Sequence, residues 1–159
     1  MRLLWAPWRK DYVTRVDKEG CFLCQALRME DGVDNLVLKR GKEAFIILNR
    51  YPYNSGHLMV APLRHVGEIL ELKEEEEREL WEFLKTGIRI IRRVYSPQGL
   101  NIGINLGRPA GAGLVSHLHI HIVPRWEGDT NFLPLLSETK VIPESLEESY
   151  KKLLKAFSD

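Results

Sequence analysis

Three histidines alternate with aliphatic residues in the stretch SHLHIHIVPRW at residues 116–126. On a β-strand, successive side chains point to opposite faces of the sheet. A strand over residues 117–123 would therefore place His117, His119 and His121 on one face and bury the aliphatic side chains between them. Thr, Lys or Glu would serve equally well on a merely exposed face, so the repeated choice of histidine indicates a chemical role.

Imidazole titrates near neutrality, so a histidine can attack a substrate, relay protons or bind a metal. Neighbours on the same face of a strand lie about 7 Å apart, because each residue rises about 3.3 Å. That separation is larger than the distance between ligands of one small ion. The spacing therefore favours a nucleophile flanked by two polar groups over a metal site made of all three histidines.

Length and charge exclude several classes of protein. The 159 residues suit one domain, taken as 1–159, which is long enough to bury a substantial core. With 23 basic and 22 acidic residues, the chain has no overall charge that would attract nucleic acid or a membrane surface. No apolar run reaches the roughly 20 residues of a membrane helix, and the N-terminus lacks the pattern of a signal peptide. We expect a cytoplasmic protein.

Hydrophobic periodicity predicts an α+β fold. The clearest helix covers residues 74–95, where apolar side chains recur at spacings of three and four. Strands are expected at 35–40, 43–49, 57–62, 100–106 and 117–123, with a short helix at 21–30 and a C-terminal helix at 143–157. Strands in succession, with one long helix before the last two, predict a five-stranded, mostly antiparallel sheet.

A glycine-rich loop, GRPAGAG at residues 107–113, immediately precedes the histidine stretch. Glycine lets a backbone approach a ligand closely and turn its N–H groups toward an anion. Such loops are common, so it is the neighbouring histidines that favour a phosphate-binding role. Histidines beside a phosphate indicate phosphoryl or nucleotidyl transfer, with histidine as the covalent nucleophile.

The two cysteines of the chain, Cys21 and Cys24, form a CxxC motif. In a reducing compartment this spacing suits a metal or a redox pair better than a structural disulfide. A redox role lacks the thioredoxin-like context that such a motif usually has, and a bare reduced pair is the remaining alternative. A tetrahedral zinc site would need two more ligands.

The HLHIHIV motif at residues 117–123 resembles the signature of the histidine triad superfamily. The similarity continues in the strand–loop–strand segment at 44–65 and in the loop NLGRPAGAG at 105–113. The segments WAPWR at 5–9 and PRWEGDTNF at 124–132 resemble the bacterial branch that contains diadenosine tetraphosphate phosphorylases. The similar segments together span residues 5–132, and the remainder of the chain matches less distinctively.

The resemblance implies a mechanism. The middle histidine, His119, would attack the α-phosphorus of a nucleotide, and water or another acceptor would resolve the nucleotidyl-histidine intermediate. His117 and His121 would flank it and hold its ring and the phosphate oxygens. Asn49 stands where the ribose hydroxyls are bound. The phosphates would be held by Asn105 and by the amides near Gly111 and Gly113.

Other residues of these segments have two interpretations. Asn49 is also a typical turn-opening residue before Arg-Tyr-Pro. His57, in a matching Gly-His pair, would support a triad ring or be a hydrogen-bonded core histidine. Trp126 would cover the site or pack in the core. Ser116 is a candidate contact for the phosphate or leaving group, although on a strand it would face away from the histidines, and the proton donor to the leaving group is unassigned.

The resemblance also implies cofactors and partners. Relatives with CxxC indicate His65 and His117 as the remaining zinc ligands, and Mg²⁺ is a candidate companion of the substrate phosphates. Relatives pair two sheets into one of ten strands, so a homodimer is expected, with no nucleic acid or membrane partner. The leading function is phosphorolysis of diadenosine tetraphosphate to ADP and ATP. The alternatives are AMP-forming hydrolysis of dinucleoside polyphosphates or nucleoside phosphoramidates, and a non-catalytic, zinc-stabilised nucleotide-binding module.

Overall fold

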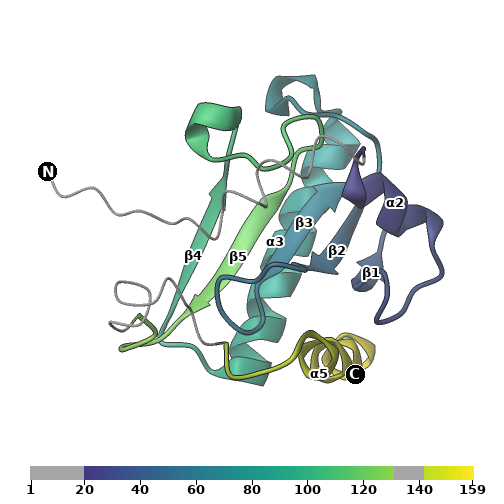
Figure 1. Cartoon of the computed structure of the whole chain (residues 1–159). Coiled ribbons are helices and arrows are strands. Elements are labelled where there is room, and N and C mark those ends of the chain that lie inside the picture. The colour runs from purple at the N-terminus through teal and green to yellow at the C-terminus, as the bar shows by residue number, and fades with distance from the viewer. Residues whose placement is uncertain (1–19, 131–141) are drawn as a thin grey trace, which may run out of the picture.

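A computed structural model describes residues 20–130 and 142–159, so the segment WAPWR and the last two residues of PRWEGDTNF lie outside the described residues. Five strands form one sheet in the order β1-β2-β3-β5-β4, and every pair is antiparallel (Figure 1). The strands are β1 (Val37–Arg40), β2 (Ala44–Leu48), β3 (Leu58–Pro62), β4 (Gly99–Ile104) and β5 (Ile120–Arg125). The helices are α2 (Phe22–Arg28), α3 (Glu74–Tyr95) and α5 (Leu146–Ser158), with single 3₁₀ turns η1 (Ile69–Glu71) and η2 (Arg108–Ala110). The predicted α+β fold is confirmed.

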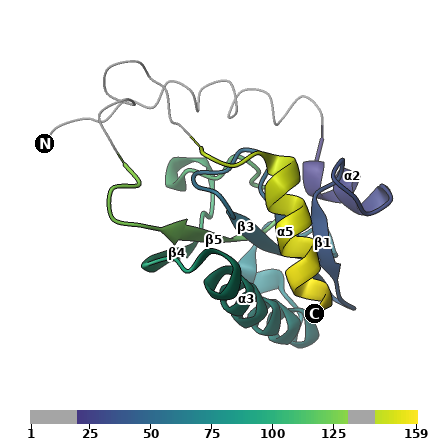
Figure 2. The ribbon, with the colours of Figure 1, turned by 90° about the horizontal axis from the view of Figure 1, so that it is seen from below.

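Helix α3 lies directly on one face of the sheet, across β2, β3 and β5. At Gly87 of α3, an added Cβ would lie 2.7 Å from Cδ1 of Ile122 on β5 and 3.7 Å from Cδ1 of Leu58 on β3. Helix α5 lies beside α3 and next to β1, and the Tyr150 hydroxyl donates to the Val37 carbonyl at 3.0 Å (Figure 2). Gly87 therefore lets α3 lie close to the central strands β3 and β5.

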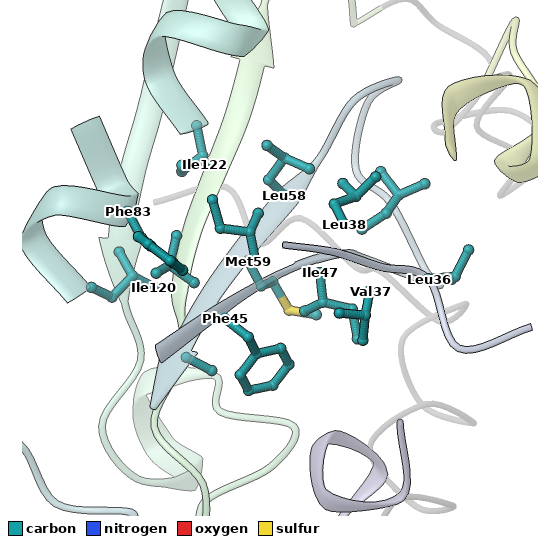
Figure 3. Packing of buried hydrophobic residues seen from close by; sticks show 14 of the residues in the cluster. Leu36, Val37, Leu38, Phe45, Ile47, Leu58, Met59, Phe83, Ile120 and Ile122 are labelled. Carbon is teal, nitrogen blue, oxygen red and sulfur yellow. The ribbon is translucent and has the colours of Figure 1, made fainter. Parts of the chain in front are cut away.

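The core continues on both faces of the central strands, which explains why β2 and β3 are buried along their whole length. Figure 3 shows Leu58 and Phe45 on opposite faces of the sheet. The face of Phe45 also carries His121, because Met59 pairs with His121 across β3 and β5 and Ala61 pairs with Phe45. The strand β4 forms an edge of the sheet, and its residues are exposed or half-buried.

The first residue of β5 is Ile120 rather than the predicted 117. Pairing between β3 and β5 ends at Val60 opposite Ile120, and two residues further along β3 stands Pro62, which has no N–H for a ladder. The Pro62 carbonyl instead accepts from Nε2 of His117, and the Leu118 N–H donates to the Val66 carbonyl at 2.7 Å. Leu118, Ile120 and Ile122 are nevertheless buried, as the alternating pattern predicts.

Helix α3 has the predicted bounds of 74–95. The Glu76 carboxylate accepts from the Lys73 N–H at its start, and Ser96 ends it in the left-handed conformation. Among the helices that the structure describes, none has the length and apolar character needed to span a membrane.

Candidate active site

His119 lies at the entrance to β5 with 4% of its surface exposed. Its Nδ1 is 2.8 Å from the backbone carbonyl of His117. Because a carbonyl can only accept, Nδ1 must carry the proton and Nε2 must carry the lone pair. Burial lowers the pKa of His119 below its ordinary value, although the bond to the carbonyl opposes this effect. The ring is therefore a neutral imidazole with a fixed tautomer, as a nucleophile requires.

His117 contacts different groups from the other two triad histidines, which corrects the expectation that all three rings line one strand face. Its Nε2 donates to the Pro62 carbonyl at 2.8 Å, and its Nδ1 lies 3.2 Å from Sγ of Cys21. Nδ1 therefore faces the cysteines, and Nε2 faces the end of β3. Residues 117–119 precede the strand, and the Leu118 N–H bonds to the Val66 carbonyl instead of to the β3 ladder. His117 contacts His119 through its carbonyl.

His121 is oriented by His57, which is fully buried. The Tyr53 backbone N–H donates to Nδ1 of His57 at 3.1 Å, so the proton of His57 must lie on Nε2. That Nε2 is 2.9 Å from Nδ1 of His121, to which it donates. His121 then carries its own proton on Nε2, and its ring centroid is 4.9 Å from that of His119. His119 thus presents an Nε2 lone pair, and His121 beside it presents an Nε2–H donor.

Asn49 follows β2 and is buried, with 5% of its surface exposed. Its Oδ1 accepts from the Tyr51 N–H at 2.9 Å, which is the geometry of a turn-opening asparagine. Its Nδ2 lies 3.4 Å from each ring nitrogen of His57. Asn49 therefore makes the expected turn and stands beside the histidine relay, and its contact with a ribose stays a prediction.

The loop before β5 folds around η2 with two left-handed glycines, Gly107 at φ +80° and Gly111 at φ +95°. The Gly111 N–H donates to the Arg108 carbonyl at 2.9 Å, so it is engaged within the loop. Asn105 Nδ2 is 3.4 Å from the Gly111 carbonyl, which ties the end of β4 to this loop. Gly113 is buried where the chain turns toward the triad. The phosphate contacts expected from Asn105 and the Gly113 amide stay predictions.

Two predicted contacts lie at the margin of this site. Ser116 is exposed, and its backbone passes 3.2 Å from the position that a Cβ on Gly67 would take. Trp126 follows β5 and packs edge-on against Tyr95 of α3, with ring centroids 6.5 Å apart. Its place beside α3 matches the packing interpretation, and a role for either residue in substrate binding stays a prediction.

A polar cavity of about 390 Å³ opens beside His121, over β4 and β5. Its lining includes Tyr53, Asn101, Gly103 and Arg125, which the sequence reasoning did not single out. The sequence did hold a signal for part of this set. In the β4 stretch NIGIN, alternate positions place Asn101, Gly103 and Asn105 on one face of the strand.

A second cluster of polar side chains shares His117 with the triad. It consists of Cys21, Cys24, His65 and His117. Their sulfur and nitrogen ligand atoms all lie within 4.8 Å of one another. Cys21 caps α2, where its Sγ accepts from the Cys24 N–H at 3.4 Å, and Cys24 Sγ is 3.3 Å from Nδ1 of His65. The structure therefore brings together all four predicted metal ligands.

The chemistry of this group suits zinc, which binds two thiolates and two imidazoles in a tetrahedron. His117 donates from Nε2 to a carbonyl, which leaves its Nδ1 lone pair directed at the sulfurs, a common arrangement around metal-binding histidines. Burial lowers the pKa of His117 to about 4, so its ring is neutral. Burial also raises the pKa of the Cys21 thiol to about 11, so a metal would have to displace its proton.

Comparisons with known proteins agree with this fold and site. The model of the HIT domain family matches residues 31–128. An AP-4-A phosphorylase of Mycobacterium tuberculosis is 42% identical over 96% of this chain and 83% of its own length. An asymmetrical bis(5'-nucleosyl)-tetraphosphatase of Schizosaccharomyces pombe is 32% identical over 74% of this chain and 60% of its own length.

Solved structures show the same fold. A hypothetical histidine triad nucleotide-binding protein of Sulfolobus tokodaii has a TM-score of 0.67 and 31% identity, and the match covers 86% of this chain and 89% of that one. A zinc-bound histidine triad family protein of Mycobacterium smegmatis has a TM-score of 0.67 at 23% identity, covering 90% and 96%. The fold and the triad together define a histidine triad protein, and the chain belongs to the HIT domain family. It is an enzyme of this family, as its curated relatives are.

Proposed function

We propose that the protein transfers a nucleotidyl group from a dinucleoside polyphosphate to inorganic phosphate, with diadenosine tetraphosphate as its substrate. The observation that carries the proposal is the fixed tautomer of His119. Its Nδ1 proton is held by the His117 carbonyl, so the Nε2 lone pair is available to attack phosphorus. A module that only bound nucleotides would have no need of this arrangement.

The first step forms a bond between Nε2 of His119 and the α-phosphorus while the bond from that phosphorus to the bridging oxygen breaks. ATP leaves with the electron pair of that bond. The Nε2 proton of His121, whose ring is held by His57, would donate to a phosphate oxygen of the same centre. Such a preorganised donor stabilises the charge that develops during the transfer.

In the second step an oxygen of inorganic phosphate attacks the nucleotidyl phosphorus, and the bond to His119 breaks. The products are then ADP and free imidazole. Asn105 and the Gly113 amide would hold the phosphates, and Asn49 would hold the ribose hydroxyls of the transferred nucleotide. Mg²⁺ would accompany the phosphates of the substrate.

Phosphate is preferred to water as the acceptor for two reasons. The M. tuberculosis relative, 42% identical over nearly the whole chain, bears the name of a phosphorylase. Gly113 also stands in the loop where a larger side chain would reduce the room for a second anion, and its N–H would be a donor to that anion. Hydrolysis is the second candidate, because the tetraphosphatase of S. pombe is 32% identical.

Product analysis separates the two reactions. Purified protein is incubated with diadenosine tetraphosphate, with and without millimolar phosphate, and the nucleotides are resolved by chromatography. Phosphorolysis gives ADP and ATP, and hydrolysis gives AMP and ATP. Adenosine 5′-phosphoramidate is a third substrate, which tests the remaining hydrolase alternative. If AMP forms at one rate in both conditions and ADP never forms, the phosphorylase proposal is wrong.

We also propose that Cys21, Cys24, His65 and His117 bind one zinc ion with a structural role. The support is the convergence of four suitable donors and the orientation of His117 described above. Such an ion would join the start of α2 to the loop after β3 and to the triad. It would therefore stabilise the segment from which the His117 carbonyl holds the nucleophile.

Finally, we propose that residues 1–159 form one domain, that two copies form a homodimer, and that the protein acts in the cytoplasm. The dimer is supported by the edge strand β4, which exposes apolar side chains. Ile102 on this strand is 45% exposed, and Leu106 shortly after it is 43% exposed. Unpaired edges tend to be covered by another strand. Light scattering should give about twice the chain mass of 18.4 kDa, and a strict monomer at micromolar concentration would contradict the proposal.

A further inference from the structure

Neither the backbone conformation nor the packing at position 103 requires a glycine. Gly103 lies inside β4, directly opposite His121 on β5. The φ angle of Gly103 is outside the left-handed region, so its backbone conformation does not require glycine. A Cβ at this position would have no described heavy atom within 4 Å. A glycine weakens the interior of a strand, and it often marks a place that a ligand or another backbone approaches closely.

The open space above Gly103 belongs to the cavity of about 390 Å³ beside His121. Asn101 lies two residues before Gly103 on the same face of β4, and Asn105 follows directly after the strand and lines the same cavity. Tyr53 lies on the other side of His121, with ring centroids 6.1 Å apart and near-parallel planes. A ligand over Gly103 would therefore meet carboxamide groups and an aromatic ring.

The charge of the cavity indicates which part of a ligand it suits. Arg125 is the one charged residue among the described residues that line it. Its guanidinium binds both carboxylate oxygens of Asp129, at 2.6 and 2.9 Å, and the Oδ1 of Asn101 at 2.6 Å. The Arg125 guanidinium holds the pKa of Asp129 far below its usual range, so the pair is ionised and its charges cancel. An uncharged, hydrogen-bonding group fits this lining better than a phosphate does.

We propose that this cavity binds the second nucleoside of a dinucleoside polyphosphate, the one that leaves with the polyphosphate chain. The proposal rests on the proposed function, since it assigns the far end of that substrate. The cavity shares His121 and Asn105 with the triad site, so it begins where the phosphate chain would pass. Carboxamides can bond to the edges of a base or to ribose hydroxyls, and an aromatic ring can stack on the base. Gly103 keeps the floor of the cavity open.

The test compares two substrates with the same number of phosphates. Diadenosine tetraphosphate carries the second nucleoside, and adenosine 5′-tetraphosphate lacks it. Gly103→Val adds volume at the floor of the cavity with a residue that strands favour. We expect the ratio of kcat/KM for the two substrates to fall about tenfold in Gly103→Val, as loss of a well-filled contact predicts. Leu100→Val is the control, because it places valine on the same strand and outside the cavity lining.

A binding experiment separates this proposal from the proposed function. In His119→Ala protein, which would not turn over substrate, calorimetry should show tighter binding of diadenosine tetraphosphate than of adenosine 5′-tetraphosphate, and Gly103→Val should remove the difference. If that difference exists but the unmodified enzyme turns over neither substrate, the proposed function fails and the nucleoside site stands. If turnover occurs and both ligands bind equally, the nucleoside site is wrong. A change in molecular mass in Gly103→Val would also overturn it, because the glycine would then serve assembly.

Discussion

His119 and His117 are joined by a single hydrogen bond, from Nδ1 of His119 to the backbone carbonyl of His117 at 2.8 Å. The ring of the same His117 faces Cys21 and Cys24. One residue therefore connects the candidate nucleophile to the candidate metal group. The tautomer of His119 therefore depends on the backbone position of His117, whose ring contacts both cysteines.

Replacement of the nucleophile should separate chemistry from binding. We expect His119→Ala to abolish turnover of diadenosine tetraphosphate while its affinity for nucleotide stays within about tenfold, because the covalent step is lost and most ground-state contacts remain. Steady-state rates and calorimetric titration measure the two effects. Turnover close to that of the unmodified protein would refute the assignment of His119.

Removal of His57 should weaken catalysis without removing any of the three triad histidines. His57→Leu leaves Nδ1 of His121 without the donor that fixes its tautomer. We expect kcat to fall about 10- to 100-fold, the usual effect of losing an outer partner of a functional histidine. Nitrogen NMR of the imidazoles should also show that His121 no longer holds one tautomer, a change that simple destabilisation would not produce.

Tyr51→Phe is the control for this variant, since it alters a 60% exposed side chain in the same loop and keeps the backbone. An unchanged kcat and an unchanged His121 spectrum in His57→Leu would show that the relay has no role.

The dependence of activity on pH should reflect the burial of His119. Burial lowers the pKa of His119, so the neutral, nucleophilic ring persists below the ordinary value of 6.5. We expect kcat/KM to decline on the acid side with a midpoint below 6.5, since this parameter reports groups of the free enzyme. The unfolded chain binds a proton at this residue at a higher pH than the folded chain does. The contribution of His119 to stability is therefore lost as the pH falls from 6.5 to the lower pKa of the folded chain. An acid limb with a midpoint above 6.5 would contradict this account.

Metal analysis should find about one zinc ion per chain in protein prepared without added metal or a histidine tag. We expect Cys21→Ser combined with Cys24→Ser to lose the ion and to lower the unfolding temperature, because the bond energy of the site is present only in the folded chain. Stoichiometric zinc in the double variant would exclude this set of ligands.

A stability prediction concerns Glu79, which joins α3 to the turn between β1 and β2. Its carboxylate accepts from the backbone N–H groups of Lys42 at 3.1 Å, Glu43 at 2.5 Å and Ala44 at 2.6 Å. Burial by itself would raise the pKa of Glu79, but the three N–H donors together lower it. We expect Glu79→Gln to reduce the free energy of unfolding by about 1–3 kcal/mol at neutral pH, as loss of charge-assisted hydrogen bonds predicts.

The pH sign of this effect follows from the lowered pKa. The contribution of Glu79 is complete above 4.5 and is lost as the pH falls through the folded pKa, so the two proteins should converge in acid. Urea unfolding measures the difference, and Glu82→Gln is the control, being an exposed glutamate on the same helix. Equal effects of the two substitutions would contradict the role of Glu79.

Most of the helices and strands, and many of the side chains that they bury, could be predicted from local sequence patterns. The apolar spacing in residues 74–95 gave the bounds of α3, because a helix must bury one stripe of side chains. The alternation correctly predicted that Leu118, Ile120 and Ile122 are buried, but His117 and His119 are buried as well, and the strand starts later than expected. The Cys and His residues that the family resemblance grouped do converge.

The division of the site into a nucleophile and a candidate metal group could not be predicted from local patterns. The tertiary structure directs the His117 ring to the cysteines and places His57, 64 positions away in the chain, against His121. It also reveals the cavity over Gly103, which requires β4 to lie at the edge beside β5. Local periodicity fixes the face on which a side chain lies. The partner that its nitrogen atoms meet depends on contacts between distant segments, such as the end of the ladder at Pro62, and these form only when the chain folds.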